Sequence, residues 1–154
     1  MATLFEQVEQ FFADSNWAVS PLEGRTILQM GFQGDRGQWT CYAQVLEARQ
    51  QFVFYSTYPE KVPAARRQHV AELLTRANFG LAIGNFELDF ADGEVRYKTG
   101  IDVSGDRLSD GLIVQMMDAN LSAMDRYLPA IAAVLEDATI SPEQAIAMVE
   151  KQRD

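Results

Sequence analysis

Residues 84–100, GNFELDFADGEVRYKTG, hold the densest group of ionisable side chains in the chain. Glu87 and Asp89 alternate along this stretch, so two carboxylates on one face could act as general acid and general base. That chemistry requires one carboxyl group to be shielded from water, so that its pKa rises. A calcium loop is not indicated, because Asp89-x-x-Asp92-Gly93 lacks alternating oxygen ligands and a distal Glu. An acid/base enzyme that uses Glu87 and Asp89 is therefore one hypothesis.

The same stretch also has the pattern of a β-hairpin. Asp92-Gly93 between two alternating runs is typical of a two-residue type I′ turn. This turn predicts a register with the following pairs: Phe90 opposite Val95, Asp89 opposite Arg96, Leu88 opposite Tyr97, Glu87 opposite Lys98, and Phe86 opposite Thr99. Each carboxylate then faces a cation on the wet side of the ribbon and stays ionised. We therefore predict that these charges are structural and that the protein is not an enzyme.

Other residue types that support catalysis or metal binding occur without partners. His69 is the only histidine, and no second His or Cys completes a zinc shell. Cys41 alternates with apolar residues, so we expect it to point into the core. Gly80 and Gly84 follow a predicted helix and lead into a strand, whereas a phosphate loop leads into a helix. The sequence thus predicts no catalytic residue, cofactor or metal.

The elements that position these residues follow from hydrophobic periodicity. Thr3 and Glu6 form a capping box, which predicts a helix over residues 4–14. Three strand-like runs at 26–34, 37–48 and 50–58 are joined by short loops, and they predict an antiparallel meander. Pro63 suits the first turn of a second helix over residues 63–78.

The last third of the chain has helical periodicity. Apolar residues recur with a period near 3.6 over residues 109–136, and Pro129 within this segment predicts a kink or break at Leu128. Ser141, Pro142 and Gln144 predict the start of a final short helix. The fold class is therefore α+β, in the order helix, three-stranded meander, helix, hairpin, long helix and short extra helix. We expect a two-layer sandwich and one domain over residues 1–154.

Composition narrows the classes of function. The chain has 154 residues, 13 Lys plus Arg and 22 Asp plus Glu, for a formal net charge of −9. This charge disfavours nucleic acid and anionic membranes as partners. The N-terminal residues have no basic region of the kind that marks a secretory signal, and the single cysteine fits a reducing compartment. We therefore predict a cytoplasmic protein.

The meander predicts a binding surface. Residues 52–58 carry large side chains on both faces of the predicted strand, and one layer of helices covers only one face. A second face that carries Tyr42 and part of this run implies either a second covering layer or a subunit contact. A two-fold dimer is the commonest solution for such a surface, so we predict a homodimer. We predict Tyr42, Phe54 and Tyr55 as contacts for a client or regulatory protein. The alternative is a small-molecule sensor with an apolar pocket between the long helix and the sheet, lined by Met116, Met117, Met124 and Tyr97.

One stretch also resembles a known family. The pattern N-x-x-x-x-x-x-N-F-E-L-D-F-x-D-G-E-V-R-Y-K-T (78–99), then I-D-V and a helix carrying M-D-R-Y-L-P-A-I (124–131), is similar to the YbjN family of small bacterial proteins. The resemblance covers nearly the whole chain. It implies a sensory transduction regulator with a fold similar to the type III secretion chaperones, which are acidic, dimeric and without cofactor or catalytic residues. No family motif assigns functional residues to this chain.

Overall fold

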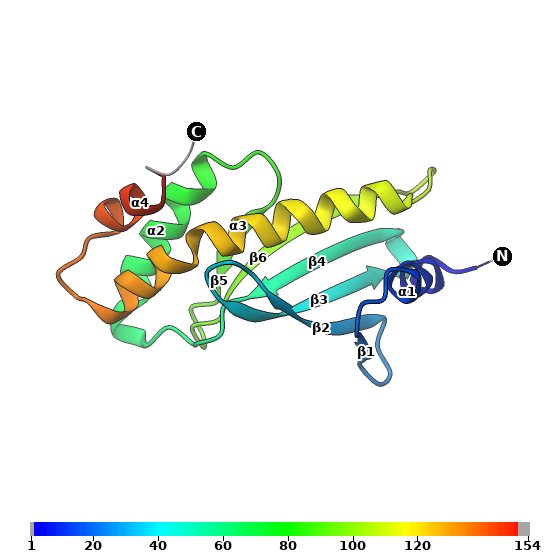
Figure 1. Ribbon diagram of the computed structural model, residues 1–154, viewed down its shortest axis with the longest axis horizontal. Helices are drawn as coiled ribbons and strands as arrows, with labels where there is room; N and C mark the ends of the chain where they lie inside the picture. Colours follow the sequence, from blue (N-terminus) through cyan, green and yellow to red (C-terminus); the bar gives the residue numbers. More distant parts are fainter. Residues whose placement is uncertain (1, 151–154) are drawn as a thin grey trace.

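The computed structural model describes residues 2–150, in which a layer of helices packs on an antiparallel sheet (Figure 1). The helices are α1 (Leu4–Asp14), α2 (Arg67–Phe79), α3 (Asp110–Glu136) and α4 (Pro142–Glu150), with short 3-10 turns at Glu47–Arg49 and Ala64–Arg66. The strands are β1 (Ser20–Pro21), β2 (Ile27–Gln33), β3 (Gln38–Leu46), β4 (Gln51–Thr57), β5 (Asn85–Leu88) and β6 (Val95–Asp102). The predicted α+β class and two-layer arrangement are confirmed.

The strands form one six-stranded sheet in the order β1-β2-β3-β4-β6-β5. The predicted meander is β2, β3 and β4, and β6 pairs with β4, so the hairpin extends the same sheet. The edge strand β1 was not predicted from the sequence. It has only two residues, Ser20 and Pro21, which pair with Gln29 and Leu28, and so short a strand leaves no alternation to detect.

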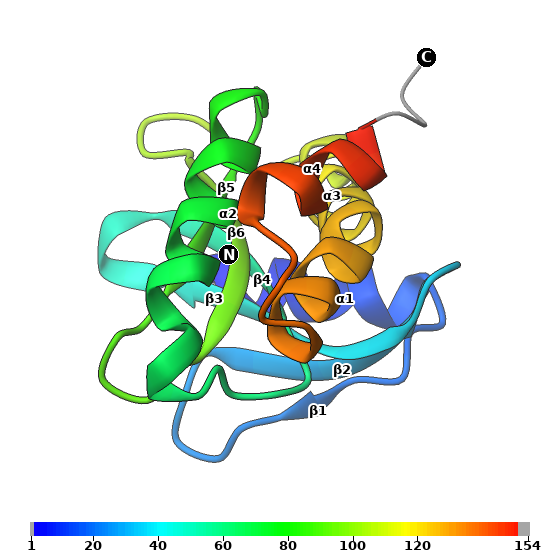
Figure 2. The same ribbon diagram turned by 90° about the vertical axis from the view of Figure 1, so that its left-hand side faces the viewer.

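Side-chain burial alternates strictly along the long strands. On β3, Trp39, Cys41, Ala43 and Val45 are buried, and the residues between them are half-buried. The buried face packs against the helices: α3 runs along β4 and β6, α2 lies against β5, and α1 lies against β3 (Figures 1 and 2). We call the opposite side of the sheet the open face, because no helix of residues 2–150 covers it.

The first helix is held at its N-terminus by two sets of polar contacts. The predicted capping box forms between Thr3 and Glu6. In addition, the carboxylate of Glu47 accepts hydrogen bonds from the backbone N–H groups of Leu4 and Phe5, each at 3.0 Å. Burial raises the pKa of Glu47, but these two bonds and one from the Gln50 side chain together outweigh burial and lower it below the ordinary value. A carboxylate at the positive end of a helix stabilises the docked position of α1.

The sequence predicts a kink or a break at Leu128, and the long helix α3 runs unbroken through Pro129, so the break is excluded. Proline removes one backbone donor, but the residues around it are buried against the core and α4, including Met124, Ala130 and Ile131. This packing keeps the helix in register. The predicted box before α4 is present: Ser141 Oγ accepts from Gln144 N at 3.1 Å, and Gln144 Oε1 accepts from Ser141 N at 2.9 Å.

Candidate functional site

The charged hairpin has a different register from the predicted one. Leu88 pairs with Val95, Phe86 with Tyr97, and Glu87 with Arg96. The strands are shifted by two residues relative to the prediction, so the side chains of the paired residues stay on the predicted faces. Phe90, predicted opposite Val95, instead lies outside the strand and is exposed. Residues 89–94 form a loop, in which Asp89 N donates to Glu94 O and Gly93 N donates to Asp89 O. The two-residue turn and the Asp89–Arg96 pair were therefore wrong.

Tertiary contacts explain the longer loop. Gly93 has a φ of +86°, and its carbonyl accepts a hydrogen bond from Val62 N at 2.8 Å. Lys61 Nζ lies 2.8 Å from an Asp92 carboxylate oxygen, and Arg67 donates to Phe90 O at 2.9 Å. The loop is thus fastened to the segment between β4 and α2, and its acidic residues serve this attachment.

Glu87 is the one hairpin carboxylate that lies between two cations. One of its oxygens accepts from Arg96 Nε and the other from Lys98 Nζ, each at 2.7 Å. Partial burial raises the pKa of Glu87, but the hydrogen bonds from Lys98 and Arg96 outweigh burial and hold the pKa below its ordinary value. A general acid needs the opposite shift. Glu87 therefore has the electrostatics of a structural carboxylate.

The buried polar groups of the core are partnered among themselves. Asn120 of α3 is fully buried and donates to the backbone oxygens of Phe54 and Tyr97, at 2.8 and 3.0 Å. Its own oxygen accepts from Ser56 Oγ at 2.5 Å. Cys41 lies beside this network, and burial raises the pKa of its thiol to about 11. An unionised, buried thiol is a poor nucleophile.

The three predicted contact residues do not share one surface. Tyr42 and Tyr55 are directly opposite each other on the open face, at the centre of the sheet. Phe54 points the other way and is fully buried under the helices, so the structure corrects its predicted place on the surface. The physical reason is the period-two alternation, which sends neighbours 54 and 55 to opposite faces.

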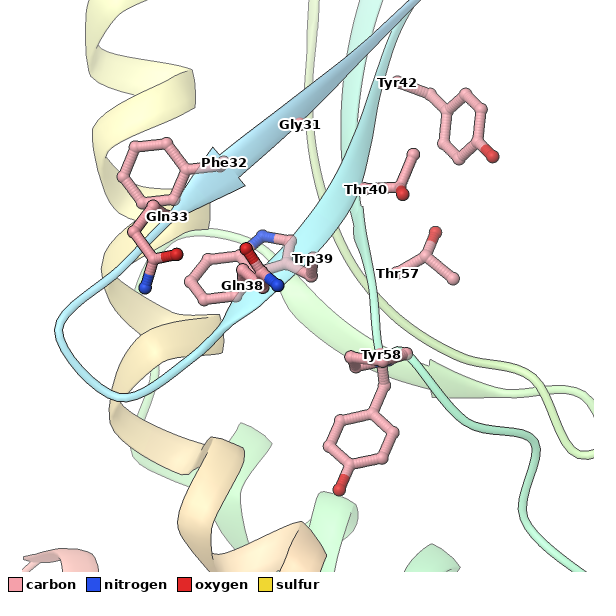
Figure 3. A pocket seen from close by; sticks show the side chains of 10 residues that line it. Gly31, Phe32, Gln33, Gln38, Trp39, Thr40, Tyr42, Thr57 and Tyr58 are labelled. Atoms are coloured by element: carbon pink, nitrogen blue, oxygen red, sulfur yellow. The ribbon is translucent and has the colours of Figure 1, made fainter.

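Tyr42 and Tyr55 form a ridge between hollows in the open face. A hollow of about 700 Å³ lies beside Tyr42 and is lined by Gly31, Thr40 and Thr57, among others. Figure 3 shows Thr40, Tyr42 and Thr57 on one side of the strands, and Phe32 and Trp39 on the side of α3. A second hollow of about 510 Å³ lies beyond Tyr55, where Gly100 presents no side chain.

The open face carries charged side chains of both signs. Arg96 lies over the ring of Tyr55, 4.3 Å from its centroid, while its Nε is held by Glu87. A third hollow, of about 300 Å³, is lined by both tyrosines and by Arg25, Glu94 and Arg96. The centre of this face therefore combines aromatic rings, small residues and the guanidinium group of Arg96, which Glu87 holds in place.

The outer edge of β2 was not predicted from the sequence. In an antiparallel ladder, every second residue directs its backbone N–H and C=O groups to the neighbouring strand. Gly34 N donates to Gly37 O, so the even-numbered residues of β2 are the ones that hydrogen-bond to β3. The backbone groups of Gly31 and Gln33 therefore point outward, where no strand of the described residues pairs with them. A Cβ built on Gly31 meets nothing within 4 Å. A glycine inside a strand is the sequence feature that could have indicated this accessible backbone.

The region proposed for a small-molecule pocket is filled by side chains. Met117, Met124 and Tyr97 are buried in the core, and Met116 is half-buried against it. Within residues 2–150, no helix is both long and apolar enough to cross a membrane.

The fold and the paired charges define a class: a small α+β module with one open sheet face. The profile of the YbjN family, described as "Putative bacterial sensory transduction regulator", matches residues 5–133, and the chain belongs to this family. A search of curated proteins gives no match.

Solved structures with this fold have low sequence identity to the chain. YbjN from E. coli, described as "a putative transcription regulator", has a TM-score of 0.61 at 10% identity, and the match covers 85% of this chain and 87% of that protein. An uncharacterized protein from Methanothermobacter thermautotrophicus has a TM-score of 0.57 at 12% identity, covering 84% and 97%. The HopA1-SchA chaperone-effector complex contains a chain with a TM-score of 0.55 at 14% identity, covering 79% and 91%. These similarities show the fold.

Proposed function

We propose that this protein is a non-enzymatic, cytoplasmic binding module with a chaperone-like or regulatory role, acting as a homodimer. The observation that carries the proposal is the open face: a tyrosine ridge between hollows, continuous with the unpaired edge of β2. The family description as a regulator and the chaperone-effector complex among the similar folds support this assignment.

Binding uses two surfaces that lie side by side. Tyr42 and Tyr55 supply large, rigid contact area, which is characteristic of residues that contribute most to protein recognition. Gly31 and Gln33 present backbone donors and acceptors to an extended segment of the partner, which adds to the sheet as a further strand. Strand addition gives affinity, and the hollows select side chains. Phe54 has no part in this contact because it lies in the core.

Site-specific photocrosslinking tests the proposal. Benzoylphenylalanine replaces Tyr42 or Tyr55 in cells, and Val114, which is exposed on α3, serves as the control position. We expect crosslinked partner protein from the two tyrosine positions and none from position 114. Equal crosslinking from all three positions, or none from the tyrosines, contradicts the proposed surface.

Sedimentation equilibrium tests the dimer separately. We expect a mass of twice the chain mass at micromolar concentration. A monomer across the accessible concentration range contradicts the homodimer and leaves the partner-binding face as a separate question, answered by the crosslinks.

A further inference from the structure

The outer edge of β2 lies between two hollows of different chemistry. On the open face, the hollow of about 700 Å³ includes Gly31, Phe32 and Gln33. On the α3 side, a hollow of about 350 Å³ includes Phe32, Gln33 and Gly34 together with Trp17. Successive side chains of a strand point to opposite faces. A strand added along this edge therefore sends alternate side chains toward each hollow.

The hollow on the α3 side combines aromatic and acidic groups. Trp17 and Phe32 are stacked with their ring planes 12° apart and their centroids 6.1 Å apart. The other lining side chains include Asp35, Asp118 and Asp125, and no lining residue is basic. This lining suits a cation, because an aromatic surface and a carboxylate both stabilise positive charge.

The carboxylates of this hollow are not equally engaged. Asp125 is largely buried and accepts from the backbone N and the Nη1 of Arg36, at 2.9 and 3.0 Å. Asp35 and Asp118 are exposed, and neither makes an ion pair with another described residue. Asp125 thus fixes the tip of the β2–β3 hairpin against α3, while Asp35 and Asp118 remain available to a ligand.

We propose that the partner segment added to β2 carries a Lys or Arg whose side chain enters the hollow between Trp17 and Asp118. This inference rests on the proposed function, because it requires an extended segment of a partner protein on the same edge. The chain's net charge of −9 attracts such a segment. The hollow on the open face is lined by neutral groups such as Thr40, Tyr42 and Thr57. The residues on either side of the basic residue are therefore uncharged.

Peptide selection tests this specificity. A phage-displayed library of random dodecapeptides is panned on the immobilised protein, on the variant Asp35→Asn/Asp118→Asn, and on the control Glu23→Gln/Asp106→Asn. The control loses the same charge at exposed positions outside the hollow. We expect the wild type and the control to enrich Lys or Arg flanked by uncharged residues. The Asp35→Asn/Asp118→Asn variant still captures peptides, but without enrichment of a basic residue.

A double-mutant cycle on one enriched peptide measures how much the basic residue contributes to the affinity. Replacing its basic residue with Gln weakens binding to the wild type about tenfold, as expected for one cation held by an aromatic surface and a carboxylate. The same replacement changes binding to Asp35→Asn/Asp118→Asn by much less. Peptides that bind without a basic residue, or whose basic residue is equally important in both proteins, overturn this inference and leave the proposed function standing. Failure to capture any peptide counts against both.

Discussion

Replacing Asn120 with Leu tests whether the buried polar network anchors α3 to the centre of the sheet. Leu has a similar size but no polar atoms, so the variant loses the bonds to Phe54 O, Tyr97 O and Ser56 Oγ. The two carbonyls keep their hydrogen bonds within the β4–β6 ladder, so the substitution does not leave them unsatisfied. Each lost bond therefore costs only the net contribution of a hydrogen bond, about 0.5–1.5 kcal/mol. We expect a loss of about 3 kcal/mol of unfolding free energy, or roughly 6–12 °C in melting temperature.

Urea titration and thermal melts followed by circular dichroism measure this loss. Gln115→Leu makes a comparable polar-to-apolar change on the exposed side of α3 and is expected to stay within about 0.5 kcal/mol of the wild type. Ser56→Ala combined with Asn120→Leu should cost less than the sum of the two single changes, because both remove the same hydrogen bond. The reasoning is refuted if Asn120→Leu is no more destabilising than Gln115→Leu.

Three shorter predictions concern the hairpin and the thiol. Glu87→Gln should cost about 1 kcal/mol at neutral pH. Because the folded pKa of Glu87 is lowered, its contribution is complete above the ordinary pKa and lost as pH falls through the lowered one. In urea melts, the difference in unfolding free energy between the wild type and Glu87→Gln should therefore shrink at acidic pH. A difference that does not change with pH argues against this reasoning. Gly93→Ala should destabilise far more than Gly105→Ala in the same melts, since both have positive φ but only a Cβ at 93 meets the backbone of Val62. Equal losses would contradict the docked loop. Cys41, whose pKa is raised to about 11, should react with Ellman's reagent at pH 8 only on unfolding, and rapid labelling of the native protein would contradict its burial.

Much of the fold could be predicted because its periodic patterns are local. The alternation along 38–46 gave the two faces of β3, and the capping residues Thr3 and Ser141 marked helix starts that the structure confirms. The faces of the hairpin were also predicted correctly. Its register was not, because the turn is decided by contacts of Gly93 with Val62, which lies in a distant part of the sequence.

The candidate site was predictable only in part. Tyr42 and Tyr55 could be placed on strands, but residues 52–58 carry large side chains on both faces, and the sequence did not show that the helices cover the face of Phe54. The hollow beside Tyr42 depends on Gly31, which leaves open space next to side chains of other strands such as Thr40 and Thr57. No local sequence pattern identifies residues of different strands that come together in this way.

The sequence by itself determined the order of the elements, the apolar face of each and the excess of negative charge, because these depend on residue type and spacing along one segment. Only the tertiary structure decided which face stays uncovered, that the edge of β2 is unpaired beyond β1, and that Trp17 and Asp118 border one hollow. The physical reason is that strand order and helix placement bring together side chains far apart in the chain, and their shared environment exists only after folding.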